Sequence, residues 1–457
     1  MLVDFTVRNW KSYAGQASLN LVASRERHHA ESLSAVPGFR SLKVNPIAAI
    51  YGGNASGKSN LFDALAFVKQ FVLHGAGVSE PIAVEPYRLN ADCLTEPSSF
   101  DISFLADGSV YRLHFSATHT QVLEESLEIL REKRKLDVLY ERDASGISVL
   151  KAGATSPERL RFIAEGTRRN CLFLTAAAMQ NVRELEAPYG WFKDCLELVG
   201  VSSYMPSLAA FYTREDFLPF ASRTLVALDT GIEDLVGEPV DPASLDISLP
   251  SVNEIALELA GPRGDGGAAV LFLGRQGDYA SEMLFLTVDK GAGGQVSTQR
   301  LRARHRDASG KLVTFPLQME SSGSRRLIHL MPMLLHLLGG VRSSQKVYVV
   351  DELDRSLHSM LTLQVVREYL STCGPASRRQ LLFTTHDLLL MDQRLMRRDE
   401  MYITEREGRG ESVLIGLSEY GDLRSDKDLL RSYLDGRFGG VPMFRSVAAS
   451  SWAGEER

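Results

Sequence analysis

The chain has 457 residues, of which 44% are hydrophobic and 24% are charged, and its 51 basic and 57 acidic side chains give a formal net charge of −6. This composition is that of an ordinary globular protein, and it excludes collagen-like, low-complexity and disulfide-scaffold chains. The negative net charge is opposite in sign to that of a protein that coats DNA. Because the chain is longer than a typical single domain, we expect two lobes or a domain with an insertion.

Features that report on cellular location agree with one another. The four cysteines are scattered without a C-x-x-C pair, which favours a reducing compartment over a disulfide or zinc framework. The N-terminal residues mix acidic and basic side chains, and no signal peptide is evident. The longest apolar run, Leu327–Val341, is too short to span a bilayer and contains Pro332. The sequence therefore predicts a cytoplasmic protein without a membrane segment.

The first part of the chain predicts strands and one helix. Short strands are expected at Leu2–Val7, Ala17–Val22 and Pro46–Tyr51. A glycine cluster follows the third strand, and Leu61–Phe71 then carries apolar residues at helical spacing, which indicates a strand–loop–helix unit. Alternating segments from Phe100 to about residue 150 predict further strands, with a hairpin turn at Asp107-Gly108. We assign residues 1–152 to an N-terminal lobe.

The rest of the chain predicts an insert followed by a second lobe. Amphipathic stretches from Pro157 to about Val236 indicate helices, and the Gly-, Pro- and Asp-rich segment from Gly237 to about Tyr279 indicates a linker or flexible loops. We assign 153–265 to a mainly helical insert and linker, and 266–457 to a C-terminal lobe. Within this lobe we expect a helix from Ser324, a strand at Lys346–Val350, a helix from Ser356, a strand at Gln380–Thr385, strands near Met401 and Ser412, and a frayed end at Ser446–Arg457.

A phosphate-binding loop is the strongest motif. It comprises Gly52, Gly53, Asn54, Ala55, Ser56, Gly57, Lys58 and Ser59, with Asn60 directly after it. Glycines let successive backbone N–H groups surround phosphate oxygens at the positive end of the following helix. Lys58 would reach the β- and γ-phosphates, and the Ser59 hydroxyl would ligate Mg²⁺. The strand before the loop and the helix after it supply the context that this motif requires.

A second motif is the apolar strand KVYVV followed by Asp351 and Glu352. The first carboxylate can hold Mg²⁺ and the second can polarise a water, as phosphoryl transfer requires. Lys58 and Asp351 are far apart in the sequence, so a large insertion separates the two halves of one nucleotide site. Prolines interrupt this insertion and no heptad pattern runs through it, which favours a globular insert over a coiled coil.

Two further elements have alternative interpretations when each is read alone. Glu320 to Arg326 forms a small-residue turn at a helix start, where Ser321 and Gly323 could bind a γ-phosphate or could simply cap the helix. His386 ends a strand in the sequence FTTHD, and a lone histidine is more often structural than functional. The order of the four elements along the chain favours the nucleotide-site interpretation for both.

Together these segments resemble the ABC-class ATPase domain of the OLD and RloA-like family, which is related more distantly to RecF and SMC proteins. The matching segments are GGNASGKSN, ESSGSRRL, VVDELDRSLH and TTHD. Val7–Ser12 is similar to the family's N-F-[KR]-S start, and Tyr433–Pro442 is similar to its G-R-[FY]-G closing motif. The resemblance thins out from about 150 to 290. It implies an α/β fold: an ABC-type P-loop ATPase head with a mixed sheet, two lobes and a helical insert between the halves of the nucleotide site.

The resemblance also implies roles for single residues. Asp351 would hold Mg²⁺ through water, Glu352 would be the general base, and His386 would sense the γ-phosphate. Ser321 and Gly323 would cap the ATP of a second subunit, and Asp354 would cross the dimer interface. His358 matches the family pattern without an assigned role. The glutamine that usually links the lobes to the metal is not located, and Lys11 is assigned either to the nucleotide or to the surface.

Departures from the family pattern bear on function. Glu320 and Ser322 stand where an ABC transporter would have leucine and glycine, which weakens a transporter interpretation. Many OLD proteins carry a Toprim nuclease after the ATPase, whereas no acidic cluster of nuclease type is evident after His386. Nuclease chemistry would therefore need a partner. Basic clusters at 131–135, 302–306 and 325–326 are candidate contacts for nucleic acid or ordinary surface charge.

The function that we predict is an ATPase using ATP and Mg²⁺, assembled as a homodimer or higher homo-oligomer around sandwiched ATP. By analogy with the family, it would act as a nucleotide-driven sensor or regulator in anti-phage defence with a separate nuclease or toxin effector. Two alternatives remain. One is a RecF-like DNA-binding ATPase in DNA repair, and the other is an ATP-bound, non-hydrolysing scaffold for a toxin.

Overall fold

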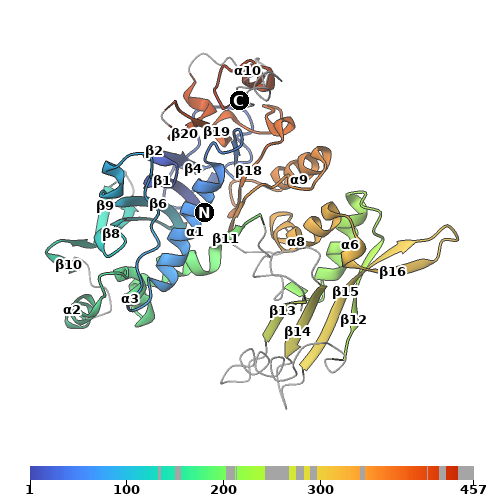
Figure 1. Ribbon diagram of the computed structural model, residues 1–457, viewed down its shortest axis with the longest axis horizontal. Coiled ribbons are helices and arrows are strands. Elements are labelled where there is room, and N and C mark those ends of the chain that lie inside the picture. Colours follow the sequence, from blue (N-terminus) through green and yellow to red (C-terminus); the bar gives the residue numbers. More distant parts are fainter. Residues whose placement is uncertain are drawn as a thin grey trace, which may run out of the picture.

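The computed structural model describes residues 1–131, 135–149, 156–201, 211–212, 214–241, 267–273, 282–288, 296–339, 345–408, 410–420 and 429–440. Within these residues the chain has a mixed α/β fold built on three larger sheets (Figure 1). A small two-stranded sheet of β3 (Ser34–Ala35) and β4 (Lys43–Val44) accompanies them.

The first sheet has seven antiparallel strands in the order β10-β9-β8-β7-β6-β1-β2. These strands are β1 (Leu2–Trp10), β2 (Tyr13–Asn20), β6 (Ser98–Ala106), β7 (Ser109–Ala117), β8 (Val122–Arg131), β9 (Lys135–Asp143) and β10 (Gly146–Val149). Helix α1 (Lys58–His74) packs on this sheet through aromatic contacts. Phe67 of α1 lies 5.1 Å from the ring centroids of both Trp10 and Phe100. This aromatic cluster fixes the start of the chain beside the helix that follows the phosphate loop.

The second, central sheet has the order β11-β17-β18-β5-β19-β20. Its strands are β5 (Ile47–Tyr51), β11 (Leu196–Val199), β17 (Lys346–Val350), β18 (Arg379–Thr384), β19 (Met401–Arg406) and β20 (Ser412–Gly416). All neighbours are parallel except β19 and β20. Strands β5, β17 and β18 are almost wholly buried, as the continuous apolar runs in their sequences require.

Helices cover both faces of the central sheet. Helix α1 shares a core with Ala48, Ile50 and Val349, so it lies between the first sheet and one face of the central sheet. Helices α8 (Ser322–Leu337) and α9 (Ser359–Ser371) share the core of the opposite face with Tyr51 and Val350. Among the described residues, the remaining α-helices are α2 (Pro157–Gly166), α3 (Phe173–Met179), α4 (Glu186–Gly190), α6 (Phe217–Ala227) and α10 (Leu429–Leu434).

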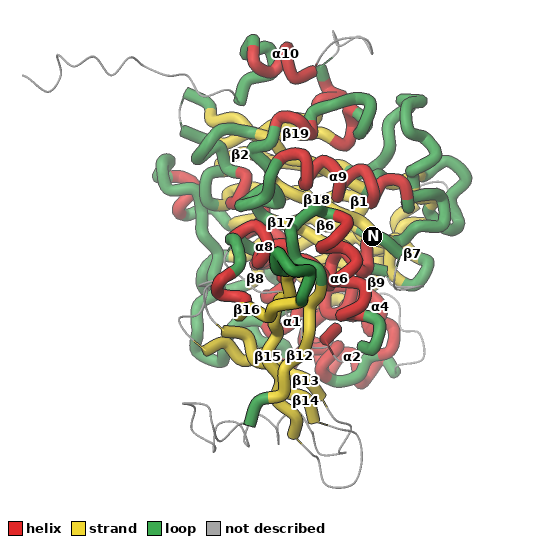
Figure 2. Tube along the Cα trace, turned by 90° about the vertical axis from the view of Figure 1, so that its right-hand side faces the viewer, coloured by secondary structure: helices red, strands yellow, loops and turns green. Residues whose placement is uncertain are grey.

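The third sheet, here called the arm, projects from the body of the molecule (Figure 1). It contains β12 (Asp234–Pro239), β13 (Gly267–Leu273), β14 (Glu282–Val288), β15 (Val296–Arg306) and β16 (Leu312–Pro316). Leu235, Leu301 and Ala303 of the arm join the core around α6 and α8. Figure 2 shows the arm and α10 at opposite ends of the molecule.

The predicted elements correspond unevenly to the observed ones. The strand at Lys346–Val350 is confirmed as β17, and the strand–loop–helix unit is confirmed as β5 and α1. The linker or flexible loops predicted from Gly237 to about Tyr279 are wrong at 237–239, which end β12, and at 267–273, which form β13.

The segment predicted as a mainly helical insert contains α2, α3, α4 and α6, but it also supplies β11 to the central sheet and β12 to the arm. The boundaries at 152 and 265 stay a prediction. Residues 441–457, with the end of the closing motif and the predicted frayed end, lie outside the described residues.

Candidate nucleotide site

The candidate site lies at the carboxyl ends of three neighbouring strands. Strand β5 leads into the phosphate loop, β17 into Asp351 and Glu352, and β18 into His386. Because β17, β18 and β5 are adjacent and parallel, their carboxyl ends meet at one edge of the sheet. Ligands of open α/β sheets bind at this edge. Pairing of the strands thus brings together motifs that the sequence separates widely.

The phosphate loop, Gly52–Ser59, has the backbone conformation that its glycines allow. Gly52 and Gly57 have φ values of 151° and 114°. A Cβ on Gly52 would lie 2.5 Å from the Thr404 carbonyl oxygen, and a Cβ on Gly57 would lie 2.5 Å from the Ser412 hydroxyl. Gly57 precedes α1 without a side-chain cap, so the first N–H groups of this helix remain available to an anion.

Lys58 is buried inside the loop. Its Nζ donates hydrogen bonds to the carbonyl oxygens of Gly52 at 2.7 Å and Gly53 at 3.1 Å. Burial lowers the pKa of Lys58, while the nearby carboxylates of Asp351 and Glu352 oppose this shift. The ammonium group is therefore close enough to these carboxylates for their charges to act on it.

The two residues after Lys58 differ in their surroundings. Ser59 is exposed, as a metal-ligating hydroxyl at the loop would need to be. Asn60 is held by the start of the chain: its carbonyl accepts from Trp10 Nε1 at 2.9 Å and its side-chain amide donates to Ser12 Oγ at 2.7 Å. Asn54 and Ala55 are exposed on the loop, whereas Ser56 is buried.

Thr384 organises the acidic pair. Its hydroxyl donates to Asp351 Oδ1 at 2.6 Å and accepts from the Glu352 backbone N–H at 2.7 Å. Asp351 is buried, and Glu352 is half-buried with φ 51°. The left-handed backbone turns Glu352 away from the strand direction, and its carboxylate lies 3.5 Å from Arg355. One oxygen of Asp351 is thus oriented by Thr384, and the other is left for a metal or its water.

His386 and Asp354 are joined within the same chain. The His386 backbone N–H donates to Asp354 Oδ2 at 3.3 Å. Burial and the ammonium group of Lys58 lower the pKa of His386, and the carboxylates of Asp354 and Glu352 act in the opposite direction. The histidine is therefore close enough to Lys58 and the acidic residues to share one site with them. The predicted interface role of Asp354 stays a prediction.

The signature turn, residues 320–326, lies beside the loop that follows β17. Ser321 caps α8, because its hydroxyl accepts from the Ser324 N–H at 3.0 Å. A Cβ on Gly323 would lie 2.7 Å from the Ser356 carbonyl oxygen, so only glycine allows this approach. Neither Ser321 nor Gly323 is hydrogen-bonded to the phosphate loop, although all of these residues are described. The helix-cap interpretation thus holds within the chain, and Ser321 remains exposed.

His358 and Lys11 have structural partners. His358 caps α9, where its Nδ1 accepts from the Met360 N–H at 3.2 Å. Lys11 Nζ lies 2.6 Å from Asp63 and 3.4 Å from Glu85. Burial alone would lower the pKa of Lys11, but these ion pairs raise it. The positive charge of Lys11 is therefore balanced by these two carboxylates beside α1.

Sequence reasoning missed Thr404, which supports the phosphate loop from β19. Its hydroxyl lies 2.5 Å from Ser56 Oγ and 3.2 Å from the Tyr51 carbonyl oxygen. Ser412 of β20 similarly donates to Ser12 Oγ at 2.8 Å, beside Gly57. No local motif marks Thr404 or Ser412, since their position follows from the pairing of β19 with β5 and β20.

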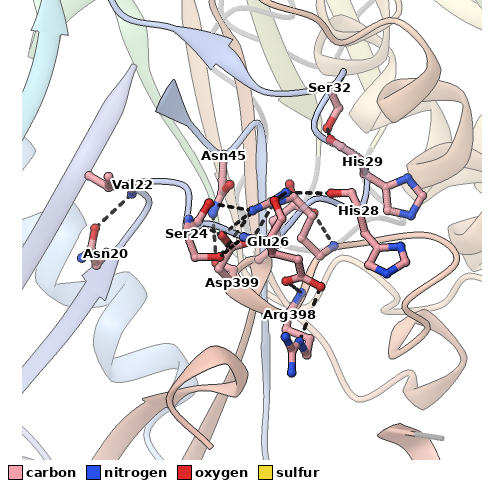
Figure 3. Close-up of polar contacts among 12 residues, drawn as sticks. Asn20, Val22, Ser24, Glu26, His28, His29, Ser32, Asn45, Arg398 and Asp399 are labelled. Atoms are coloured by element: carbon pink, nitrogen blue, oxygen red, sulfur yellow. Dashed lines mark hydrogen bonds and ion pairs between the residues drawn. The ribbon is translucent and has the colours of Figure 1, made fainter. Parts of the chain in front are cut away.

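A buried polar network, shown in Figure 3, was also missed. Asp399 accepts from the Ser24 N–H at 2.6 Å, and its backbone carbonyl accepts from Asn45 Nδ2 at 3.0 Å. Arg397 pairs with both carboxylate oxygens of Asp399 at 2.8 Å and donates to the Glu26 carbonyl oxygen at 2.9 Å. The network fastens the loop after β2 to the turn that precedes β19. Its signal in the sequence was only the charged run RRDE before an apolar strand.

The predicted basic clusters are largely paired where they are described. On β15, Arg302 lies 2.8 Å from Glu238 and Arg304 contacts Asp234. Arg306 lies 3.3 Å from Glu233. Arg326 is buried in α8. The centre of the cluster at 131–135 lies outside the described residues. Within the described residues, no helix combines the length and apolar character that crossing a membrane requires.

The residues of the site fit Mg-ATP. Gly52 and Gly57 leave no room for a Cβ, and the helix start has N–H groups without a side-chain cap. The charge of Asp351, a carboxylate oriented by Thr384, acts on the buried Lys58. Lys58 and the loop amides would hold the phosphates, while Ser59 and Asp351 would hold the metal. Bound Mg²⁺ would neutralise charge that develops on the phosphates.

Comparisons with known proteins extend these observations. The SMC head domain from Thermotoga maritima aligns over 91% of this chain and 98% of that chain, at 13% identity and a TM-score of 0.36. The recombination mediator protein RecF-ATPrS in the RecFOR pathway aligns over the same shares at 13% identity, with a TM-score of 0.29. Likenesses this distant carry no inference about function, and no curated protein matches the sequence. The family described as "AAA domain, putative AbiEii toxin, Type IV TA system" matches residues 47–392, which is more than half of the chain, so this chain belongs to that family of P-loop AAA-domain proteins.

Proposed function

We propose that this chain is a cytoplasmic ATPase that binds and hydrolyses Mg-ATP and acts as a nucleotide-driven sensor or regulator in anti-phage defence. A separate nuclease or toxin would be its effector. One observation carries the ATPase proposal. The parallel strands β5, β18 and β17 deliver Lys58, His386 and the Asp351-Glu352 pair to one edge of the central sheet.

The chemistry assigned to each residue follows from its surroundings. Lys58 would leave the loop carbonyls and pair with the phosphates, whose charge replaces those two hydrogen bonds. Glu352 would orient the attacking water as general base, because its side chain is half-exposed next to the oriented Asp351. His386 would donate to the γ-phosphate from the end of β18.

The ATP would be shared between two copies of the chain. Ser321 and Ser322 are exposed, and the signature turn adjoins the 355–358 loop through Gly323. Large apolar side chains are exposed near these elements: Met319 at 70%, Met360 at 56% and Leu389 at 48%. Exposed apolar groups beside an exposed signature turn favour burial against a second copy.

The defence role is supported by the family description, which names a toxin and a type IV toxin–antitoxin system. Among the described residues, no group of three or more His, Cys, Asp and Glu side chains could hold a metal ion. By analogy with the family that the motifs resemble, we assign effector chemistry to a partner, with ATP binding and hydrolysis controlling the association.

Mass photometry of wild type and Glu352→Gln, each with and without Mg-ATP, tests the proposal when phosphate release is followed in parallel. We expect the variant to stop hydrolysing ATP and to accumulate an ATP-dependent dimer or its multiples. Ser321→Arg in the same background should abolish that species. A mass that does not respond to ATP would overturn the association switch and favour a preassembled scaffold.

A mixing experiment tests whether the site is shared. Lys58→Ala and Ser321→Arg should each be inactive alone, because one lacks the phosphate lysine and the other blocks the signature turn. In a randomly mixed two-fold dimer, one composite site of the hybrid is intact, so activity should return to at most about a quarter of the wild-type rate. Full hydrolysis by Ser321→Arg alone would place the whole site within one chain.

The RecF-like alternative has a separate signature. DNA-stimulated hydrolysis and salt-sensitive DNA binding by the purified protein would favour it. The paired arginines of β15 do not support it, since their charge is already balanced by Glu238 and Asp234.

A further inference from the structure

The C-terminal segment, residues 429–440, touches the phosphate loop directly. The Gly440 carbonyl oxygen accepts a hydrogen bond from the Gly53 N–H at 3.1 Å. The same carbonyl accepts from the Tyr433 hydroxyl at 2.8 Å, and Tyr433 is buried. A loop amide and a buried tyrosine therefore meet at one carbonyl group near the end of the chain.

The segment is seated on β19 in a way that only glycine permits. Gly439 and Gly440 have φ values of 68° and 70°, in the left-handed region. A Cβ on Gly439 would overlap the carboxylate of Glu405, and a Cβ on Gly440 would lie 2.7 Å from Ile403 Cγ2. The backbone of the segment thus lies closely against the side chains at the carboxyl end of β19.

The remainder of the segment is anchored away from the loop. Phe438 is buried and packs on Tyr420 with ring centroids 5.1 Å apart. The Tyr420 hydroxyl donates to the Phe438 carbonyl oxygen at 2.8 Å. Tyr420 and Tyr433 therefore make equivalent hydrogen bonds to the same turn, but only the one from Tyr433 reaches the carbonyl that holds the phosphate loop.

The loop is consequently held from two sides. Thr404 of β19 bonds to Ser56, while Gly440 bonds to Gly53. The adjacent glycines Gly52 and Gly53 have the most backbone conformational entropy to lose when they become ordered. A loop that is already held in place loses less of this entropy when ligand binds. The contact with Gly440 lies at the second of these two glycines, at the start of the loop.

We propose that the C-terminal segment is a positioning element of the nucleotide site, which acts through the Gly440 carbonyl to hold the phosphate loop in its binding conformation. This inference rests on the proposed function, because it assigns the segment to the same ATP site. The segment touches no catalytic group, so its loss should weaken ATP binding and leave the chemical step largely unchanged.

The test measures the dissociation constant of a fluorescent ATP analogue with Mg²⁺, together with KM and kcat, for three variants of the full chain. Gly440→Ala introduces the clash with Ile403 at a left-handed position, and Tyr433→Phe removes only the hydroxyl. We expect nucleotide affinity to fall about three- to tenfold in both, as loss of one hydrogen bond implies, with kcat within about twofold of wild type. Tyr420→Phe is the matched control and should bind as wild type does.

Unchanged affinity in both Gly440→Ala and Tyr433→Phe would overturn the proposal, and so would an equal loss in Tyr420→Phe. Thermal unfolding without nucleotide identifies a variant that merely misfolds. If Gly440→Ala misfolds, the more conservative Tyr433→Phe still tests the proposal. Absence of ATP binding by the wild type would instead contradict the proposed function itself. The two failures are therefore distinguishable.

Discussion

Glu400 is a buried carboxyl whose titration should control stability near neutral pH. It is 1% exposed, and one oxygen accepts from the Arg397 N–H at 2.8 Å. The other oxygen has no hydrogen-bond partner among the described residues. Burial raises the pKa of Glu400 from 4.5 to about 8, despite the hydrogen bond from Arg397 that acts in the opposite direction. The carboxyl is therefore protonated in the folded protein at neutral pH.

The sign of the effect follows from the raised pKa. Above pH 4.5 the unfolded chain releases the Glu400 proton, whereas the folded protein keeps it. The contribution of this proton to the free energy of unfolding is therefore complete below pH 4.5 and is lost as pH rises toward 8. The loss amounts to about 1.4 kcal/mol per pH unit within this window. Between pH 5 and pH 7, the free energy of unfolding of wild type should therefore fall by about 3 kcal/mol relative to that of Glu400→Gln, whose neutral amide does not titrate.

Urea denaturation of wild type and Glu400→Gln at several pH values from 5 to 9 measures this difference. Other titrating groups contribute to both proteins and cancel in the comparison. Exposed Glu407→Gln is the control, and its pH profile should run parallel to that of wild type. A difference between wild type and Glu400→Gln that stays constant over the range, or that grows in favour of wild type as pH rises, would refute the reasoning.

Three other substitutions test supports of the site and the fold. Gly52→Ala places a Cβ 2.5 Å from the Thr404 carbonyl oxygen, so ATP should no longer raise the melting temperature; a normal ATP-induced shift would contradict the steric argument. Thr404→Val removes the hydroxyl that bonds to Ser56 and should lower the free energy of unfolding, measured by urea denaturation, by about 1–3 kcal/mol. An unchanged midpoint would count against a supporting role for this hydroxyl. Glu125 is buried and accepts from the Phe173 N–H at 2.8 Å, so Glu125→Ala should cost about 3–5 kcal/mol and speed hydrogen exchange at the start of α3; slow exchange there would exclude this anchoring role.

The sequence predicts best what is encoded locally. The phosphate loop and the strand before Asp351 are recognisable because each depends on a few consecutive residues: glycines that permit positive φ, or an apolar run that ends in carboxylates. Their meeting at one edge required only the general rule that parallel strands share the direction of their carboxyl ends. This part of the site could therefore be predicted without coordinates.

The supports of the site were not predictable, because they depend on which strands pair. Thr404 reaches Ser56 only because β19 lies beside β5, and no residue near Thr404 in the sequence indicates this neighbour. Strand β11 was hidden among helices, since four residues carry too weak a pattern. Strand β15 did alternate, with Leu301 and Ala303 between arginines, but its charge favoured interpretation as a basic patch.

The signature turn shows how a departure from the transporter pattern is explained by packing. Glu320 stands where a transporter would have leucine. Its carboxylate accepts a hydrogen bond from His305 Nε2 at 2.7 Å. The His305 ring lies edge-on to Phe315 at 5.4 Å, so the turn is fastened to the β15–β16 pair of the arm. Leucine could not make this polar contact. Glu320 is therefore accounted for by its contact with the arm, while Ser321 stays exposed for the phosphate contact that we propose.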